Sequence, residues 1–103
     1  MMYSPVATIS AADLKSRMSS GENLVLLDVR RPEERDDDHI SGDTLFIPLH
    51  ELQSRTGELE QFRGSEIIIY CRSGNRSGQA CQFLNQQGFT TVNLAGGMLK
   101  WRV

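Results

Sequence analysis

The sequence predicts an α/β fold in which helices cover both faces of a parallel sheet. Short apolar runs alternate along the chain with segments of helical spacing, a pattern typical of βαβ units. The runs are apolar throughout rather than alternately polar, as expected for strands buried on both faces. With 103 residues, the chain suffices for one such domain over residues 1–103 and is too short for two.

The first third of the chain predicts a helix, a strand and the start of a second helix. Ser10 is suited to cap the first helix, and Asp13 adds an acidic group to its first turn. Gly21 ends this helix. Residues 24–27 (Leu-Val-Leu-Leu) predict a buried strand, and Pro32 stands where another helix can begin.

The rest of the chain predicts three further strands separated by helices. Residues 45–47 form a weaker strand candidate before Pro48, and a short helix is expected near His50. The clearest strand covers residues 66–70 (Glu-Ile-Ile-Ile-Tyr), because it is β-branched and ends in an aromatic residue. The remaining elements are a helix over 77–87, a strand over 91–94 and a final helical turn over 98–101.

Composition excludes several classes of protein. The net charge of −2 and pI of about 5.6 argue against a dedicated nucleic-acid binder. No stretch approaches the roughly 20 apolar residues of a membrane span, and two cysteines are too few for a disulfide scaffold. The N-terminal stretch MMYSPVATIS lacks the features of an export signal. We therefore expect a cytoplasmic protein with reduced thiols and no membrane or nucleic-acid partner.

Cys71 follows the clearest strand directly, at the edge where parallel sheets bind ligands. The loop after it consists of Arg72, Ser73, Gly74, Asn75 and Arg76. Backbone N–H groups of such a loop can curl around the sulfur, because Gly74 and Asn75 tolerate positive φ. The following helix N-terminus and the two arginines add positive charge. We therefore expect the pKa of Cys71 to lie below the free value of about 8.5, giving a nucleophilic thiolate.

The two cysteines receive different interpretations. A cysteine after an apolar strand is often only a small buried residue, but the loop sequence favours catalysis or anion binding at Cys71. Cys81 falls inside a predicted helix, where packing is the expected role. A disulfide between them is not expected. Their Cα atoms would have to lie within about 7 Å, but Cys71 stands in the loop and Cys81 about a turn and a half along the following helix.

Residues 71–77 (Cys-Arg-Ser-Gly-Asn-Arg-Ser) resemble the active-site loop of single-domain rhodaneses, the thiosulfate sulfurtransferases. Four further segments resemble the family in order and spacing, so that the resemblance covers residues 8–102. They are residues 26–30 (Leu-Leu-Asp-Val-Arg), residues 32–34 (Pro-Glu-Glu), His39-Ile40 with Gly42 and Ile47-Pro48-Leu49, and residues 94–97 (Leu-Ala-Gly-Gly) with Trp101. The chain departs from the family over residues 35–46, where Arg-Asp-Asp-Asp replaces an aromatic residue, small residues and a glycine.

The resemblance implies a three-layer α/β/α rhodanese-like fold around a five-stranded parallel sheet. It also implies a sulfurtransferase in which the Cys71 thiolate takes the outer sulfur of thiosulfate as a persulfide and sulfite leaves. Cyanide or a thiol then removes that sulfur, in ping-pong order. The loop amides are implied to hold the persulfide, and Arg72 and Arg76 to bind the anionic donor.

Loop length separates this chemistry from that of related phosphatases. Four residues, 72–75, stand between Cys71 and Arg76, whereas tyrosine phosphatases place five there. In the family comparison the shorter loop fits one sulfur atom and the longer one a tetrahedral phosphate or arsenate. A phosphatase or arsenate reductase is therefore the weaker alternative.

Other polar residues are secondary candidates. Asp28 and Arg30 are possible supporting residues, in which Asp28 orients Arg30 or a loop group, although a structural role is the favoured interpretation. His39 and His50 lack a zinc-ligand spacing, and residues 36–38 lack the glycine of a calcium loop. We expect no metal and no cofactor.

The sequence thus predicts an enzyme that acts on a small anionic sulfur donor and a thiol or cyanide acceptor. A persulfide carrier that relays sulfur between proteins needs the same loop and stays open, whereas a catalytically inactive binding domain is disfavoured by Cys71. Residues 71–103 contain four Lys and Arg and no Asp or Glu. This local positive charge fits a thiolate and an anionic donor.

Overall fold

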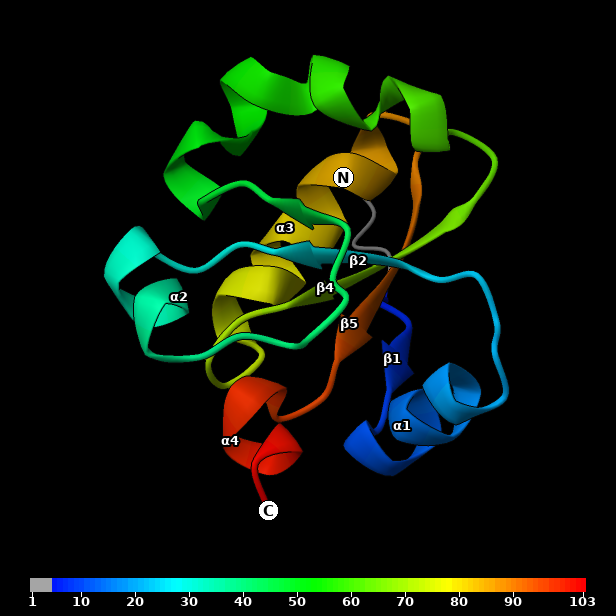
Figure 1. Cartoon of the computed structure of the whole chain (residues 1–103). Helices are drawn as coiled ribbons and strands as arrows, with labels where there is room; N and C mark the ends of the chain where they lie inside the picture. The colour runs from blue at the N-terminus through cyan, green and yellow to red at the C-terminus, as the bar shows by residue number, and fades with distance from the viewer. Residues whose placement is uncertain (1–4) are drawn as a thin grey trace.

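Five parallel strands form the sheet, in the order β1-β5-β4-β2-β3 (Figure 1). The computed structural model describes residues 5–103, so residues 1–4 of the stretch expected to lack an export signal lie outside it. The strands are β1 (Thr8–Ile9), β2 (Val25–Asp28), β3 (Leu45–Phe46), β4 (Glu66–Tyr70) and β5 (Thr90–Leu94). The helices are α1 (Ala11–Ser19), α2 (Pro32–Asp37), the 3₁₀ segment η1 (Leu49–Phe62), α3 (Asn75–Gln86) and α4 (Gly97–Trp101). This confirms the expected α/β architecture with five parallel strands.

The central strand β4 divides the hydrophobic core into two layers. Ile67 and Ile69 pack with side chains of η1 and α3, whereas Ile68 and Tyr70 pack with side chains of α1 and α4. Side chains alternate between the faces of a strand, so Cys71 continues onto the face of Ile67 and Ile69 and joins their cluster. Burial on both faces explains why this strand carries no polar alternation.

Helices α1 and α4 lie together on the Tyr70 side of the sheet (Figure 1). The predicted cap of α1 is confirmed, since the backbone N–H of Asp13 donates to Ser10 Oγ at 3.0 Å. Lys15 Nζ donates to the Trp101 carbonyl oxygen at 2.8 Å and lies 4.8 Å from the centre of the Trp101 ring. These contacts hold α4 in place beside the carboxyl ends of β4 and β5.

Three elements differ from the sequence-based expectations. The pattern located four strands and missed β1, because two residues are too few to show any periodicity; β1 is held by backbone bonds such as Ala95 N to Ile9 O at 2.9 Å. Helix α3 begins at Asn75, two residues before the expected start at Ser77. The short helix expected near His50 is the longer segment η1, which is kinked at Arg55.

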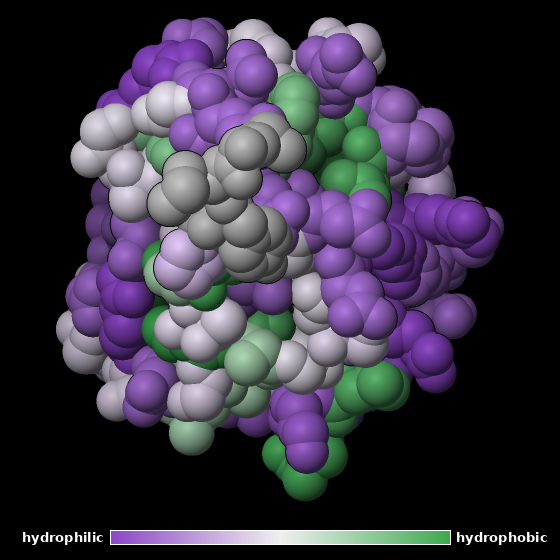
Figure 2. All heavy atoms as spheres, turned by 180° about the vertical axis from the view of Figure 1, so that it is seen from behind, coloured by the Kyte–Doolittle hydropathy of each residue, from purple (hydrophilic) through white to green (hydrophobic). Residues whose placement is uncertain are grey.

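The surface seen from behind the sheet is mostly hydrophilic, and its hydrophobic side chains form small separate groups (Figure 2). Among the residues that the structure describes, the large hydrophobic side chains left exposed are Leu99 and Val103, in and after α4. No helix within residues 5–103 is long and apolar enough to cross a membrane.

Candidate active site

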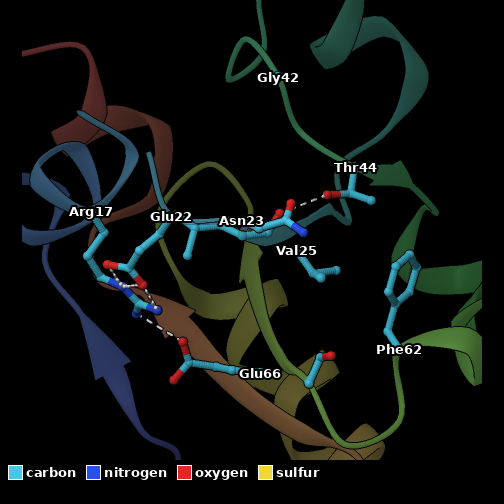
Figure 3. Close-up of a pocket in the computed structure, with 10 residues that line it drawn as sticks. Arg17, Glu22, Asn23, Val25, Gly42, Thr44, Phe62 and Glu66 are labelled. Atoms are coloured by element: carbon cyan, nitrogen blue, oxygen red, sulfur yellow. Dashed lines mark hydrogen bonds and ion pairs between the residues drawn. The ribbon is translucent and has the colours of Figure 1, made fainter. Parts of the chain in front are cut away.

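Polar side chains gather at both ends of the sheet, but Cys71 lies at only one of them. A pocket at the amino ends of β2 and β4 contains Arg17, which pairs with Glu22 at 3.1 Å and with Glu66 at 2.9 Å (Figure 3). In a parallel sheet the carboxyl ends lie at the opposite edge, and Cys71 follows β4 there. The pocket of Figure 3 is therefore remote from the candidate nucleophile.

Strand order makes the carboxyl edge near β2 and β4 the expected binding crevice. The chain continues from β2 to its outer neighbour β3, and from β4 in the opposite direction to β5. Ligands of open α/β sheets bind at such a reversal, outside the carboxyl ends of the strands. Cys71 follows β4 at this point, and Asp28 ends β2 beside it.

The loop after β4 surrounds the Cys71 sulfur with hydrogen-bond donors. Gly74 N lies 3.1 Å from Cys71 Sγ, Ser77 N lies 3.4 Å away and Ser77 Oγ lies 3.3 Å away. Gly74 permits this curl because its φ of 106° belongs to the left-handed region. Asn75 does not use that region, since positive φ occurs only at glycines within residues 5–103; it is instead the first residue of α3.

The hydrogen bonds decide the protonation of Cys71. Burial by itself raises the pKa of the thiol, but hydrogen bonds from the Ser77 side chain and from the backbones of Ser77, Gly74 and Ser73 outweigh it. The net pKa of Cys71 is lowered, in the expected direction. On sequence grounds, loop N–H groups, the helix N-terminus and the two arginines are expected to act together. The loop N–H groups do lower the pKa, and the Ser77 hydroxyl, which was not anticipated from the sequence, acts with them.

Helix α4 supports the loop after β4 through backbone hydrogen bonds. Met98 N donates to the Cys71 carbonyl oxygen at 2.9 Å, and Leu99 N donates to the Arg72 carbonyl oxygen at 3.0 Å. Gly97 lies so close to this backbone that a Cβ atom on it would approach the Arg72 carbonyl oxygen to 2.6 Å and collide with the Cys71 carbonyl oxygen. The first turn of α4 thus fixes the position of the loop.

Strand β5 supports the other side of the loop through Asn93. Asn93 Nδ2 donates to the Gly74 carbonyl oxygen at 3.0 Å. Asn93 Oδ1 accepts a hydrogen bond of 2.5 Å from Ser77 Oγ. One side chain therefore holds both the left-handed residue of the loop and the hydroxyl beside the sulfur.

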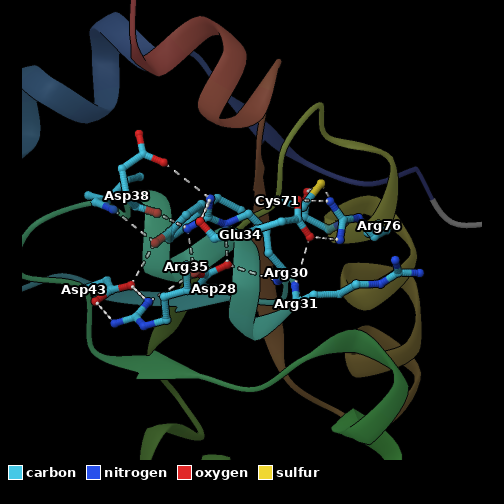
Figure 4. Close-up of polar contacts among 12 residues, drawn as sticks. Asp28, Arg30, Arg31, Glu34, Arg35, Asp38, Asp43, Cys71 and Arg76 are labelled. Atoms are coloured by element: carbon cyan, nitrogen blue, oxygen red, sulfur yellow. Dashed lines mark hydrogen bonds and ion pairs between the residues drawn. The ribbon is translucent and has the colours of Figure 1, made fainter.

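The two loop arginines have different environments. Arg76 forms a bidentate ion pair with Glu34 of α2, with N–O distances of 2.6 and 2.7 Å (Figure 4). The hydrogen bond from Arg76 is the main cause that lowers the pKa of Glu34 to about 2. Arg72 is exposed, and no carboxylate within residues 5–103 pairs with it. Arg72 thus keeps its charge available for an anion, whereas that of Arg76 is largely neutralised.

Asp28 and Arg30 form a buried ion pair beneath α2 (Figure 4). Arg30 Nε donates to Asp28 Oδ1 at 2.9 Å, and Arg30 Nη2 donates to the Asp38 carbonyl oxygen at 2.7 Å. Arg30 also reaches the Glu34 carbonyl oxygen at 3.4 Å. Asp28 therefore orients Arg30, and Arg30 in turn holds α2, the helix that carries the carboxylate facing Arg76.

The segment that departs from the family pattern carries its own polar network. Arg35 stands where an aromatic residue is common, and its guanidinium donates to Asp43 at 2.7 and 3.0 Å and to Asp28 at 3.1 Å. Tyr70 donates from its hydroxyl to Asp43 at 2.8 Å. Asp38 is partly exposed and pairs with Arg102 at 2.7 Å.

Sequence reasoning missed four residues that build the site. Ser77, Asn93, Glu34 and Gly97 were not singled out as site residues, although all contact Cys71, its loop or Arg76. Ser77 is the last residue of the segment 71–77 that resembles the family's loop, although it was given no role. The paired glycines at 96–97 indicate a close backbone approach. Glu34 falls within residues 32–34, which resemble the family, but no local pattern shows that it faces Arg76. Nothing in the local sequence identifies Asn93, because its partners are distant along the chain.

Comparison with known proteins identifies the family of this chain. The family model "Rhodanese-like domain" matches residues 10–103. A sulfurtransferase of Allochromatium vinosum is 40% identical over 97 residues, covering 93% of this chain and 88% of that protein. The thiosulfate sulfurtransferase PspE of Escherichia coli is 36% identical over 72 residues, covering 70% and 68%.

A solved structure gives the same result for the fold. The human single-domain sulfurtransferase TSTD1 superposes with a TM-score of 0.78 at 29% identity, covering 95% of this chain and 96% of that one. The parallel sheet, the loop that cradles a cysteine sulfur at its carboxyl edge and the match over nearly the whole sequence agree with one another. The chain belongs to the rhodanese-like domain family.

Proposed function

We propose that this protein transfers a sulfane sulfur from thiosulfate, or a similar anionic donor, to a thiophilic acceptor through a persulfide on Cys71. The observation that carries the proposal is the convergence of Gly74 N, Ser77 N and Ser77 Oγ on Cys71 Sγ. Such donors stabilise a thiolate at neutral pH without a histidine base. Membership of the family and the named activity of its relatives support the same reaction.

The first half-reaction loads the cysteine. The Cys71 thiolate attacks the outer sulfur of thiosulfate, a new S–S bond forms, and the bond between the two thiosulfate sulfurs breaks. Its electron pair leaves with sulfite, so the persulfide carries the negative charge on its terminal sulfur. The N–H groups of the loop then act on the persulfide as oxyanion-hole donors act on a tetrahedral intermediate.

The second half-reaction removes the terminal sulfur from Cys71. Cyanide or a thiolate attacks the terminal sulfur, and the persulfide S–S bond breaks with its electron pair returning to Cys71 Sγ. The thiolate is regenerated and the two substrates never meet, which predicts ping-pong kinetics. Arg72 supplies the available positive charge for an anionic donor, because the charge of Arg76 is largely neutralised by Glu34.

Intact-mass spectrometry after incubation with thiosulfate tests the proposal. The expected result is a gain of one sulfur atom per chain, reversed by cyanide, in the wild type and in Cys81→Ser. The matched variant Cys71→Ser should gain none.

Other outcomes assign other functions. No mass gain in the wild type from thiosulfate or from a protein persulfide would sink the proposal. Loading from a protein persulfide alone would assign a relay module. Turnover of a phosphate ester or arsenate without sulfur uptake would assign the phosphatase or arsenate reductase branch.

A further inference from the structure

The Ser77 hydroxyl stands between two acceptors and has a single proton. Ser77 Oγ lies 3.3 Å from Cys71 Sγ and 2.5 Å from Asn93 Oδ1. A hydroxyl donates one hydrogen bond at a time, although its lone pairs can accept others. Cys71 and Asn93 therefore compete for the same proton.

The orientation of the Asn93 amide decides where that proton rests. Asn93 Nδ2 donates to the Gly74 carbonyl oxygen at 3.0 Å, so Oδ1, which can only accept, faces Ser77. The strand fixes this side chain, because Asn93 N donates to the Ala7 carbonyl oxygen at 2.8 Å. At 2.5 Å from Oδ1, Ser77 donates to Asn93 and leaves a lone pair facing the sulfur.

The two protonation states of Cys71 use Ser77 in opposite directions. The neutral thiol donates its proton to Ser77 Oγ, which donates in turn to Asn93. The thiolate only accepts, so Ser77 has to turn its proton from Asn93 to the sulfur. Gly74 N and Ser77 N also point at the sulfur, and neither has to turn. Asn93 thus stabilises the thiol relative to the thiolate.

The other charged or titratable groups near the loop do not compete with Cys71 for the Ser77 proton. They are Arg72 in the loop, Arg76 and Cys81 on α3, Glu34 on α2, Asp28 at the end of β2, Tyr70 on β4 and Lys100 on α4. Glu34 is paired with Arg76, and Asp28 with Arg30 and Arg35. The pKa of Cys81 is raised to about 11, so this thiol stays neutral at neutral pH.

We propose that Asn93 is a positioning residue that holds the Ser77 hydroxyl away from Cys71 until negative charge appears on the Cys71 sulfur. A consequence for the sulfur-transfer cycle follows, and it rests on the proposed function. While the persulfide carries its charge on the terminal sulfur, the Ser77 hydroxyl keeps its hydrogen bond to Asn93. When the acceptor attacks and the electron pair returns to Cys71 Sγ, the hydroxyl turns to that leaving sulfur.

The test is a double-mutant cycle in which the pKa of Cys71 is measured. The four proteins are the wild type, Asn93→Ala, Ser77→Ala and the double variant. The pKa is read from the pH dependence of iodoacetamide alkylation of the Cys71 peptide, without any sulfur donor. With Ser77 present, Asn93→Ala should lower the pKa by up to about one unit, because the hydroxyl is released to the thiolate. In the Ser77→Ala background, Asn93→Ala should cause no shift.

Two results would overturn the proposal. An equal shift in both backgrounds, or a raised pKa in Asn93→Ala, means that Asn93 acts only by holding the Gly74 carbonyl. The similarly sized Asn93→Leu repeats the test if Asn93→Ala does not fold by circular dichroism. Asn85→Ala is the matched control, since Asn85 on α3 accepts a hydrogen bond from the Thr91 hydroxyl on β5 at 2.7 Å. It should leave the Cys71 pKa unchanged. The readout needs no persulfide, so failure of the proposed function leaves it interpretable.

Discussion

The two cysteines have the same burial and opposite chemistry. Both Cys71 and Cys81 are free, fully buried and members of the same hydrophobic cluster. Cys81, on α3, packs in the core as expected from its place in the helix, and burial raises the pKa of its thiol to about 11. The pKa of Cys71 lies below its usual value although burial opposes ionisation there too.

The difference shows that donor geometry, not exposure, separates a thiol with a lowered pKa from a thiol with a raised one. Cys71 Sγ has two N–H groups directed at it and the Ser77 hydroxyl oxygen at 3.3 Å. For Cys81 the only opposing contribution is a side-chain hydrogen bond from Thr91, which does not outweigh burial. A buried thiolate is thus stable only where a loop and a helix N-terminus replace its lost water.

The largest expected effect is a difference in alkylation rate between the two thiols. At neutral pH Cys81 is almost entirely neutral, so iodoacetamide should modify Cys71 at least about a hundred-fold faster in the folded protein. Peptide mass spectrometry measures both rates in one sample. In urea the rates should converge, because unfolding removes the donors and the burial together. Equal rates in the folded protein would refute the contrast.

Gly97→Ala should change the pKa of Cys71 and leave that of Cys81 unaffected. The new Cβ would collide with the backbone of Cys71 and Arg72, and the φ of 53° strains any other residue. We expect a loss of about 2–4 kcal/mol in the free energy of unfolding, measured in urea, and a Cys71 pKa closer to its ordinary value. Gly57→Ala is the control, because nothing lies within 4 Å of a Cβ there; a similar loss in Gly57→Ala would remove the explanation.

Serine substitutions should separate the cysteines by stability. Cys81→Ser places a hydroxyl in an apolar cluster and should cost about 1–2 kcal/mol in unfolding free energy. Cys71→Ser should cost less, because the serine oxygen accepts from the donors that surround the sulfur. Urea denaturation of both variants measures the difference, and a larger cost for Cys71→Ser would contradict it.

Glu34→Gln should widen the pKa difference between Cys71 and Cys81, but by a smaller amount. With its partner neutral, Arg76 presents its full charge to the site, and the Cys71 pKa should fall by a few tenths of a unit. The same alkylation profile measures this change. An unchanged or higher pKa would show that Arg76 does not influence the sulfur.

The same variant should alter the acid dependence of stability. The pKa of Glu34 is lowered from 4.5 to about 2, so its ion pair stabilises the fold above pH 4.5. This contribution is lost as the pH falls from 4.5 towards 2. Glu34→Gln should lack that part of the acid destabilisation in urea titrations over this range.

Local sequence was sufficient for most elements and for the position of the candidate nucleophile. The Ser10 cap, the strand at 66–70 and the left-handed Gly74 depend on residues within a few positions of one another. The edge strand β1 was missed because it exists only through backbone pairing with β5, which adjacent residues do not encode. The kinked η1 was underestimated because its buried residues, Leu52 and Leu59, are separated by mostly polar positions.

The sequence by itself determined that a thiol would follow a buried strand in a loop of four residues before an arginine. Only the tertiary structure decided how that thiol is ionised and which charges remain free. Asn93 reaches the loop from β5, Glu34 neutralises Arg76 from α2, and α4 holds the Cys71 carbonyl oxygen. The physical reason is that hydrogen bonds and ion pairs act over a few ångströms, so they depend on which strand ends the fold brings together.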